Sequence, residues 1–172
     1  MLQEIKITQA TIAQQQEIVA YVMHCRKILF PMIDHSVLPK DLKNFESYYL
    51  SSNPGAFLQA RDRNNKIVGV IAMMPYDHRF PYLGNLGKKT VEVARLFVDP
   101  EWRKFGVATS LFTELEHIAK QRGIDVLYLH THPFLTGAFE FWEKQGFEFL
   151  VSKIESDTET LHMGKTLEMN AL

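Results

Sequence analysis

The sequence predicts a single α/β domain whose central sheet is mostly antiparallel and flanked by helices. Segments of strand and helix periodicity follow one another in the order β α α β β β α β α β β. Hairpin signals between neighbouring strands favour antiparallel pairing. The helix expected over residues 107–122 provides a parallel crossover. A length of 172 residues suits one domain, 1–172, with a proper core.

The N-terminal third is expected to form a short strand and two helices. The strand covers residues 5–8, and Thr11 to Gln14 form a capping box that starts a helix reaching about Phe30. A second helix stops before Asn53, and the segment 31–39 between the helices has no clear periodicity. The apolar faces of the two helices consist of Ile18, Val22, Cys25 and Leu29 in the first, and Leu38, Leu42, Phe45 and Tyr49 in the second.

The rest of the chain alternates strands with two further helices. A hairpin signal at 62–66 separates the first two strands, and an irregular loop, 75–87, precedes the third. Gly123 and Gly146 end the two helices. The expected strands are 56–61, 67–74, 90–98, 126–130, 148–154 and 159–168, and the expected helices are 107–122 and 133–145.

The amino-acid composition and net charge limit the classes of function that the chain can have. An apolar content of 46% with 12% aromatic residues is typical of a globular protein. A net charge of −1 without a basic run disfavours nucleic acid as the main partner. Apolar stretches stop near ten residues, too short to span a membrane, and MLQEIKITQAT does not resemble a signal sequence. The single cysteine, Cys25, fits a reducing cytoplasm and is interpreted as a buried small hydrophobe.

The stretch from Thr90 to Gly123 carries the clearest chemical signal. A strand ends at Asp99-Pro100, and a short basic loop then opens directly into an amphipathic helix. The first turn of a helix presents unpaired backbone N–H groups at the positive end of the helix dipole, which suits phosphate oxygens. Gly106 and Ala108 leave the backbone open to a diphosphate, while Arg103 and Lys104 add positive charge.

Two motifs resemble those of the GCN5-related N-acetyltransferases. The pattern R-x-x-G-x-A in RKFGVA is similar to the acetyl-coenzyme A loop of that family. AFEFWEKQGFEF resembles its A-x-x-F-Y-E-K-x-G-F segment, with Ala138, Phe141, Glu143, Lys144, Gly146 and Phe147 in place. The motifs lie about thirty residues apart in the family's order, and the resemblance covers nearly the whole chain. It implies the acyl-CoA N-acyltransferase fold.

The resemblance implies acetyl-CoA as co-substrate and assigns its contacts. The pantetheine arm pairs with backbone freed where two central strands separate, and the diphosphate lies on the loop and the first helical turn. These positions are Leu96, Phe97 and Val98 for the arm, and Arg103, Lys104, Phe105, Gly106, Val107, Ala108 and Thr109 for the diphosphate. The chain departs from the family at Trp142, where a tyrosine often protonates the thiolate, at Leu135, where an asparagine is frequent, and at Ala108 in place of a third glycine.

Two residues are candidates for the general base that deprotonates the amine. Glu92 lies six residues before Val98 and, by strand periodicity, on the same face. His130 ends the next strand, and an unperturbed imidazole titrates near neutrality. The alternatives stay open: Glu92 pairs with Arg95 or Lys89, His130 caps the strand beside His132, or water or an already deprotonated amine makes a base unnecessary. Tyr128 and Tyr82 are hydroxyls that no motif marks as the missing acid.

The resulting hypothesis is a cytoplasmic, acetyl-CoA-dependent N-acetyltransferase acting on a primary amine of a small molecule, amino acid or peptide N-terminus. The alternative from another class is a catalytically weak acyl-CoA-binding sensor or interaction module, because the family's tyrosine and asparagine are absent. We expect no metal site, since among the histidines only His130 and His132 are close in sequence. Exposed strand edges in the terminal hairpin also suit a homodimer.

Overall fold

The computed structural model describes residues 4–51 and 54–168. Seven strands form one sheet in the order β1-β2-β3-β4-β5-β7-β6. All neighbouring pairs are antiparallel except β4 and β5, which are parallel, so the predicted mostly antiparallel mixed sheet is confirmed. The strands are β1 (Lys6–Gln9), β2 (Ala56–Arg61), β3 (Ile67–Pro75), β4 (Thr90–Val98), β5 (Val126–Thr131), β6 (Glu148–Glu155) and β7 (Thr158–Thr166).

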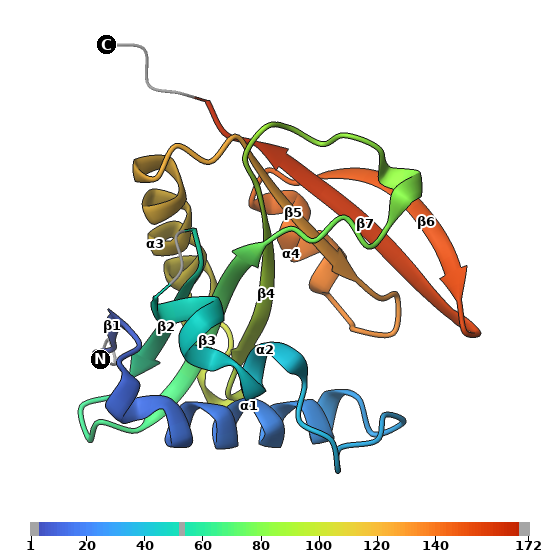
Figure 1. Ribbon diagram of the computed structural model, residues 1–172. Coiled ribbons are helices and arrows are strands. Elements are labelled where there is room, and N and C mark those ends of the chain that lie inside the picture. The colour runs from blue at the N-terminus through green and yellow to red at the C-terminus, as the bar shows by residue number, and fades with distance from the viewer. Residues whose placement is uncertain (1–3, 52–53, 169–172) are drawn as a thin grey trace.

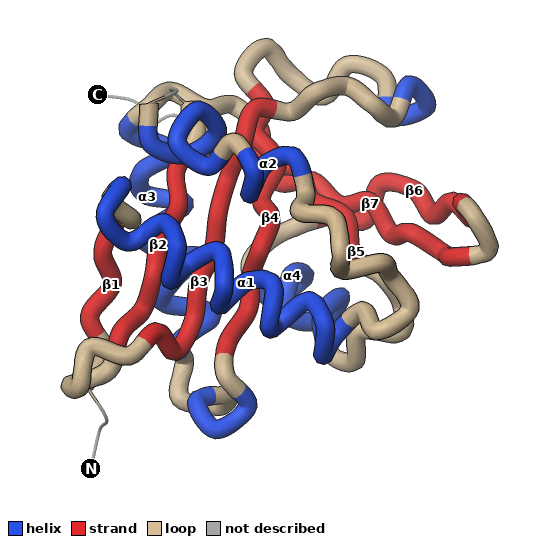
Figure 2. Tube along the Cα trace, turned by 60° about the horizontal axis from the view of Figure 1, so that its bottom comes forward, coloured by secondary structure: helices blue, strands red, loops and turns tan. Residues whose placement is uncertain are grey.

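Helices cover both faces of this sheet. Figures 1 and 2 show α1 crossing the strands on the face that also carries α2. One core cluster lies on this face, and a larger one lies between the sheet and the helices α3 and α4 on the other. The helices are α1 (Gln15–Leu29), α2 (Lys40–Lys43), α3 (Val107–Gln121) and α4 (Ala138–Lys144).

The first helix begins as its capping box predicts. The Thr11 N–H donates to Oε1 of Gln14 at 3.1 Å, and a 3-10 turn, η1 (Ile12–Gln14), leads into α1. Ile18 and Val22 are fully buried on the predicted apolar face. The capping box therefore determines where α1 begins, and with it which residues of α1 face the sheet.

The second predicted helix is broken in two. It forms the single turn α2 and a π-helical turn, η2 (Glu46–Leu50), and the predicted stop at Asn53 lies outside the described residues. Asn44 interrupts it, because its backbone leaves the helical range with a φ of −111° and a ψ of 45°. The Lys40 carbonyl oxygen accepts both the Asn44 backbone N–H at 3.0 Å and its side-chain amide at 2.9 Å, which ends α2 there. Leu42, Phe45 and Tyr49 are buried as expected, whereas Leu38, which precedes Pro39, is 38% exposed.

The last helix is shorter than predicted, because α4 starts at Ala138 rather than near 133. Gly137 precedes it with a φ of 82°, outside the helical range, so the residues before it form turns. The final strand ends at Thr166 instead of 168. Both differences leave the order of elements unchanged.

A close approach places α3 against the sheet. A Cβ atom on Gly69 in β3 would lie 3.2 Å from Cδ1 of Leu111, 3.2 Å from Cγ1 of Val107 and 3.2 Å from the Phe97 carbonyl oxygen. The absence of a side chain at Gly69 thus lets the start of α3 pack directly on β3, next to the end of β4.

The parallel strands β4 and β5 separate soon after they meet. Their pairing covers Thr90 to Glu92 on β4, although β4 continues to Val98, and Figure 1 shows the two strands diverging. The β3–β4 register shifts between Val70 and Ala72, opposite the stretch of β4 that contains Arg95, whose φ is 59°. The freed backbone that the resemblance implies is present at this point.

The same bulge corrects one prediction about the sheet faces. Glu92 pairs with Met74 and points to the α1 side, whereas Val98 pairs with Gly69 and packs with the α3 side. Because an extra residue reverses the alternation of side chains, the expectation that Glu92 and Val98 share a face is wrong.

The C-terminal hairpin forms one edge of the sheet. Three large apolar side chains of the edge strand β6 are exposed: Phe149, Leu150 and Ile154. The exposed edge behind the homodimer prediction is therefore present, and the homodimer itself stays a prediction.

Candidate active site

A cavity of about 1360 Å³ follows the divergence of β4 and β5. It joins the α3 side of the sheet, where Leu96 and Val98 point, to the α1 side, where Glu92 points. The predicted donor-site residues that line it are Leu96, Phe97, Val98, Arg103, Ala108 and Trp142. Both predicted base residues, Glu92 and His130, line it as well.

The remaining predicted donor residues form the loop and first turn beside this cavity. Gly106 has a φ of 77°, and no atom lies within 4 Å of where its Cβ would be, so the backbone there is open to a ligand. Ser110 N–H donates to the Gly106 carbonyl oxygen at 2.9 Å, so the N–H groups of Val107, Ala108 and Thr109 precede the first helical hydrogen bond. The Val107 side chain is buried, whereas Phe105 is 59% exposed. Lys104, with a φ of 71°, completes the turn.

Trp142 forms part of the cavity wall and of the core at once. It is 7% exposed, and its ring packs against Phe112, Phe141 and Phe147 at centroid distances of 5.6, 4.9 and 5.2 Å. Phe139, which sequence spacing places on the same side, contacts the ring of Phe149 instead. Trp142 is therefore a packing residue whose edge reaches the cavity.

Glu92 is held by an arginine that the sequence did not indicate. Arg79, from the irregular loop between β3 and β4, donates to Oε1 and Oε2 of Glu92 at 2.7 and 2.8 Å, and to Asp77 at 2.9 Å. The Glu92 side chain is 3% exposed, and the bond to it raises the pKa of Arg79. The alternative pairings of Glu92 with Arg95 or Lys89 are not formed.

His130 lies next to this pair. Its Nδ1 is buried 3.5 Å from Oε2 of Glu92, while the side chain as a whole is 30% exposed and lines the cavity. Burial and the positive charge of Arg79 lower the pKa of His130 to about 3. Arg79 also offsets the charge of Glu92, so the imidazole is neutral at physiological pH, and an ordinary titration near neutrality is not expected.

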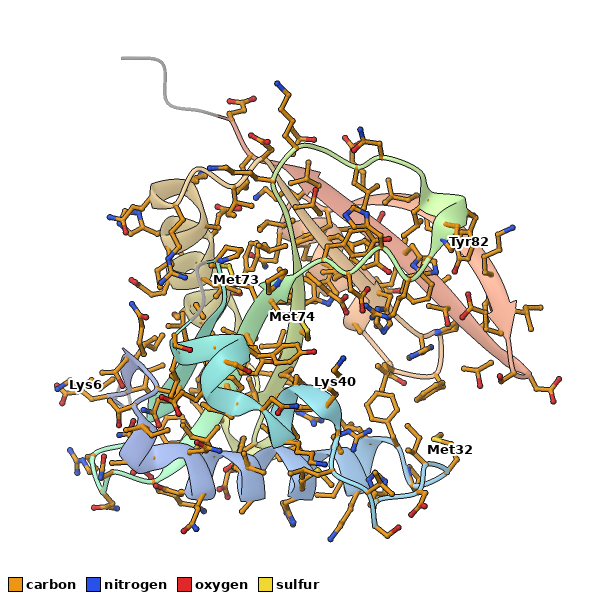
Figure 3. All side chains as sticks on the ribbon, viewed as in Figure 1. Lys6, Met32, Lys40, Met73, Met74 and Tyr82 are labelled. Atoms are coloured by element: carbon orange, nitrogen blue, oxygen red, sulfur yellow. The ribbon has the colours of Figure 1, made fainter. Side chains whose placement is uncertain are left out.

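Tyr128 and Tyr82, the two tyrosines that no motif marks as the acid, belong to a separate chain of hydrogen bonds. The Tyr128 hydroxyl lies 2.6 Å from Nδ1 of His162, and Nε2 of His162 lies 2.8 Å from the Tyr82 hydroxyl, which also bonds Glu155. Tyr128 and His162 are fully buried, and burial raises the pKa of Tyr128. Figure 3 shows Tyr82 on the loop beside β6 and β7. Neither hydroxyl lines the cavity, so neither is placed as the missing acid.

A second buried ion pair lines the α1 side of the cavity. Arg95 donates from Nε and Nη2 to the two oxygens of Asp41 at 3.0 and 2.7 Å, and the Tyr49 hydroxyl donates to Asp41 at 2.6 Å. Burial alone would raise the pKa of Asp41, but the bonds from Arg95 and Tyr49 hold it below its usual range. The sequence signal for this pair was an arginine in a mostly apolar strand.

The environment of Cys25 fits its interpretation from the sequence. Cys25 is half-buried on α1, and burial raises the pKa of its thiol, in keeping with a small hydrophobe. Within residues 4–51 and 54–168, no group of three or more His, Cys, Asp or Glu side chains is placed to hold a metal ion. In the same part of the chain, no helix combines the length and apolar character needed to cross a membrane.

Comparison with known proteins agrees with this fold. Residues 16–147 match the model of the acetyltransferase (GNAT) family. The chain belongs to this family. The matched range includes the phosphate-loop candidate, both base candidates and Trp142. The family match confirms the family and the fold that the two motifs predicted.

Individual relatives of this GNAT chain are distant. An uncharacterised N-acetyltransferase of Methanocaldococcus jannaschii is 30% identical over 123 residues, which cover 63% of this chain and 52% of the relative. Human N-acetyltransferase 8 is 27% identical over 108 residues and is matched over 45% of its length, so the chain spans about half of these curated relatives. A GNAT-family acetyltransferase from Staphylococcus aureus is 23% identical with a TM-score of 0.78, and the alignment covers 96% of this chain and 100% of that one.

The low pKa of His130 predicts how stability depends on pH. The unfolded imidazole binds a proton below about pH 6.5, whereas the folded one does not until pH falls to about 3, so stability decreases as pH falls below 6.5. Between pH 7 and pH 5 this one group should cost up to about 2 kcal/mol. Urea unfolding at pH 7, 6 and 5 measures it.

Replacing His130 by Gln should remove most of this pH dependence. His117→Gln, at an exposed position on α3, is the matched control and should leave the dependence unchanged. An equal loss of stability between pH 7 and pH 5 in wild type and His130→Gln would show that His130 is not held neutral by the fold.

Proposed function

We propose that this GNAT chain is an acetyl-CoA-dependent N-acetyltransferase that moves an acetyl group to a primary amine of a small molecule, amino acid or peptide N-terminus. The observation that carries the proposal is the single cavity linking the start of α3 to the Glu92–His130 pair through the divergence of β4 and β5. The names of the curated relatives support it. The single cysteine supports a cytoplasmic location as part of the same proposal.

The donor would lie along the α3 end of the cavity. The free N–H groups of Val107, Ala108 and Thr109 would bind the diphosphate, with Arg103 adding charge from the cavity wall. Backbone of Leu96 to Val98, unpaired with β5, would bind the amides of the pantetheine arm. When bound, acetyl-CoA supplies an activated thioester carbonyl for attack by the amine.

On the acceptor side, His130 and Glu92 would act as one unit rather than as alternatives. Because the low pKa of His130 makes it a weak base, it would accept the proton at Nε2 only once attack on the thioester carbonyl has made the nitrogen positively charged and strongly acidic. Glu92 would stabilise the resulting imidazolium from the Nδ1 side. Arg79 would keep the Glu92 carboxylate in place through its two bonds. Both oxygens of Glu92 are occupied by Arg79, which favours His130 as the group that receives the proton.

The departing thiolate would leave without a protein acid. Trp142 occupies the position where the family often has a tyrosine, and an indole N–H is far too weak an acid to protonate the thiolate. A thiol of ordinary pKa, about 8.5, is stable enough as a thiolate to depart near neutral pH. The absence of an acid is also the reason to test against the alternative, an acyl-CoA-binding sensor.

Thiol release from acetyl-CoA with a panel of primary amines tests the proposed activity. Acetyl-CoA binding is measured in parallel by calorimetry without an acceptor. Amine-dependent release supports the enzyme. Binding without release for any amine would favour the sensor, and no binding would remove the donor site altogether.

The phosphate loop predicts the effect of Gly106→Glu. A carboxylate side chain would repel the diphosphate and cover the N–H groups, so acetyl-CoA binding should be lost. Because the φ of 77° strains any side chain, the thermal midpoint should fall by a few degrees at most. Gly84→Glu, with a φ of 66° and equally open space away from α3, is the control and should keep acetyl-CoA affinity. Unchanged affinity in Gly106→Glu contradicts the assignment.

The base assignment predicts a pattern among three variants. His130→Gln should lower kcat/KM by about 10²- to 10⁴-fold, the range of general-base catalysis. Glu92→Gln should cost less, and the double variant should be no worse than His130→Gln, because residues that act as a unit are not additive. His132→Gln, whose ring lies 6.0 Å from that of His130, is the control and should retain activity.

A larger loss in Glu92→Gln than in His130→Gln would identify Glu92 as the base, acting through water. Full activity in both variants at neutral pH would reject both candidates.

Trp142→Phe tests the absence of a protein acid. The ring contacts with Phe112 and Phe147 should survive in part, so most activity should remain. Trp142→Leu, which loses the aromatic contacts, should instead destabilise the fold by an amount on the order of that for a large-to-small core substitution. A fall in kcat of more than about tenfold in Trp142→Phe, roughly 1.4 kcal/mol of barrier, with folding and acetyl-CoA affinity intact, would show that the indole N–H is catalytic.

A further inference from the structure

Two cationic side chains line the cavity near Asp41 on its α1 side. Arg95 and Lys40 line the cavity there, and Arg26 lies nearby on α1. Burial and the neighbouring charge of Arg95 lower the pKa of Arg26, and Asp41 partly offsets this, so these groups share one electrostatic environment. Figure 3 shows Lys40 at the start of α2. Arg95 is paired with Asp41, whereas Lys40 is exposed and forms no ion pair within the described residues.

Arg95 retains hydrogen-bonding capacity toward the cavity. A guanidinium has five N–H donors, and Asp41 uses two of them. The Tyr49 hydroxyl is a further neighbour of Arg95, and the remaining donors are left for a ligand. The Arg95 side chain is 17% exposed, and the pair with Asp41 fixes its orientation. An arginine held this way is preorganised to bind a planar anion such as a carboxylate.

The backbone conformation of Arg95 also supports a functional role for this residue. A φ of 59° is unusual for a residue other than glycine, and such strain persists where the surrounding structure enforces it. Arg95 is three residues from Glu92 along β4, so the two side chains leave the strand within roughly 10 Å of each other. The charge of Arg95 also contributes to the lowered pKa of His130, which places both groups in one cavity.

We propose that Arg95, with Lys40, forms an anion subsite that selects acceptors carrying a carboxylate at short range from the reacting amine. The acceptor class is then amino acids, with the amine near Glu92 and His130 and the carboxylate at Arg95. This inference rests on the proposed function and names the substrate class of that site. The carboxylates of Glu92 and Asp77 are bound to Arg79, and that of Asp99 accepts from the Tyr21 hydroxyl, so none of these three is paired with Arg95 or Lys40.

Paired acceptors that differ only in the carboxylate test the subsite. The ω-amino acids glycine, β-alanine, γ-aminobutyrate and 6-aminohexanoate are compared with ethylamine, propylamine, butylamine and hexylamine. The wild type should show at least a tenfold higher kcat/KM for the amino acid in the best pair, with an optimum at one chain length that reports the distance between the two subsites. Glycine compared with glycylglycine separates a free amino acid from a peptide acceptor, and glycinamide is the matched acceptor without a carboxylate.

The ratio of kcat/KM within a pair is the measured quantity, so general losses of activity cancel. Arg95→Gln combined with Asp41→Asn avoids an unpaired buried carboxylate, and it should bring the ratio to about one. Lys40→Gln leaves the Asp41–Arg95 pair intact and should lower the ratio a few-fold. Lys27→Gln, an exposed lysine next to Arg26 in sequence, is the matched control and should keep the ratio.

Calorimetry with reaction products separates this inference from the proposed function, because binding needs no turnover. N-acetylglycine should bind at least tenfold more tightly than N-acetylglycinamide in the presence of coenzyme A, and Lys40→Gln should reduce the difference. Carboxylate-selective binding without turnover would retain the subsite and refute the enzyme. Turnover with equal kcat/KM for acid and amine in every pair, or selectivity for a peptide over a free amino acid, would overturn the subsite.

Discussion

Arg95 holds a left-handed backbone conformation that costs roughly 1–3 kcal/mol, and its two hydrogen bonds to Asp41 oppose that cost. The bulge around Arg95 reverses the side-chain alternation of β4 just where pairing with β5 has ended. As a result, Leu96 and Val98 point to one face of the sheet and Glu92 to the other. A continuous sheet would separate these faces, whereas here a single cavity joins them. A donor and an acceptor can therefore approach from opposite sides.

The charges around this opening are arranged in pairs that leave one group neutral. Arg79 forms an ion pair with Glu92, and Arg95 forms one with Asp41, so each of these two buried carboxylates has a guanidinium partner. His130 lies among these pairs and stays uncharged, because burial and Arg79 disfavour its protonated form. The electrostatics of the acceptor side thus depend on two arginines from different elements, one on a loop and one on β4.

The sequence predicted the parts of the molecule that local pattern determines. The order of strands and helices, the start of α3 and the family follow from periodicity, from Gly106 and from two motifs. Local pattern could not reveal Arg79, because its partner Glu92 is thirteen residues away across an irregular loop. It also could not reveal the pair of Asp41 and Arg95, which are 54 residues apart. The assumed alternation between Glu92 and Val98 failed because a bulge leaves no mark in hydrophobic periodicity.

The chain of contacts from Tyr128 to Glu155 has a fixed direction. An ionised carboxylate can only accept, so the Tyr82 hydroxyl must donate to Glu155 and accept from His162. His162 then carries its proton on Nε2, and its Nδ1 must accept from the Tyr128 hydroxyl. Burial raises the pKa of Tyr82 to about 12, with the bond to Glu155 contributing, so this hydroxyl keeps the proton that sets the order. A carboxylate near the tip of the exposed hairpin thereby selects the tautomer of a fully buried histidine and orients a hydroxyl at the centre of the sheet.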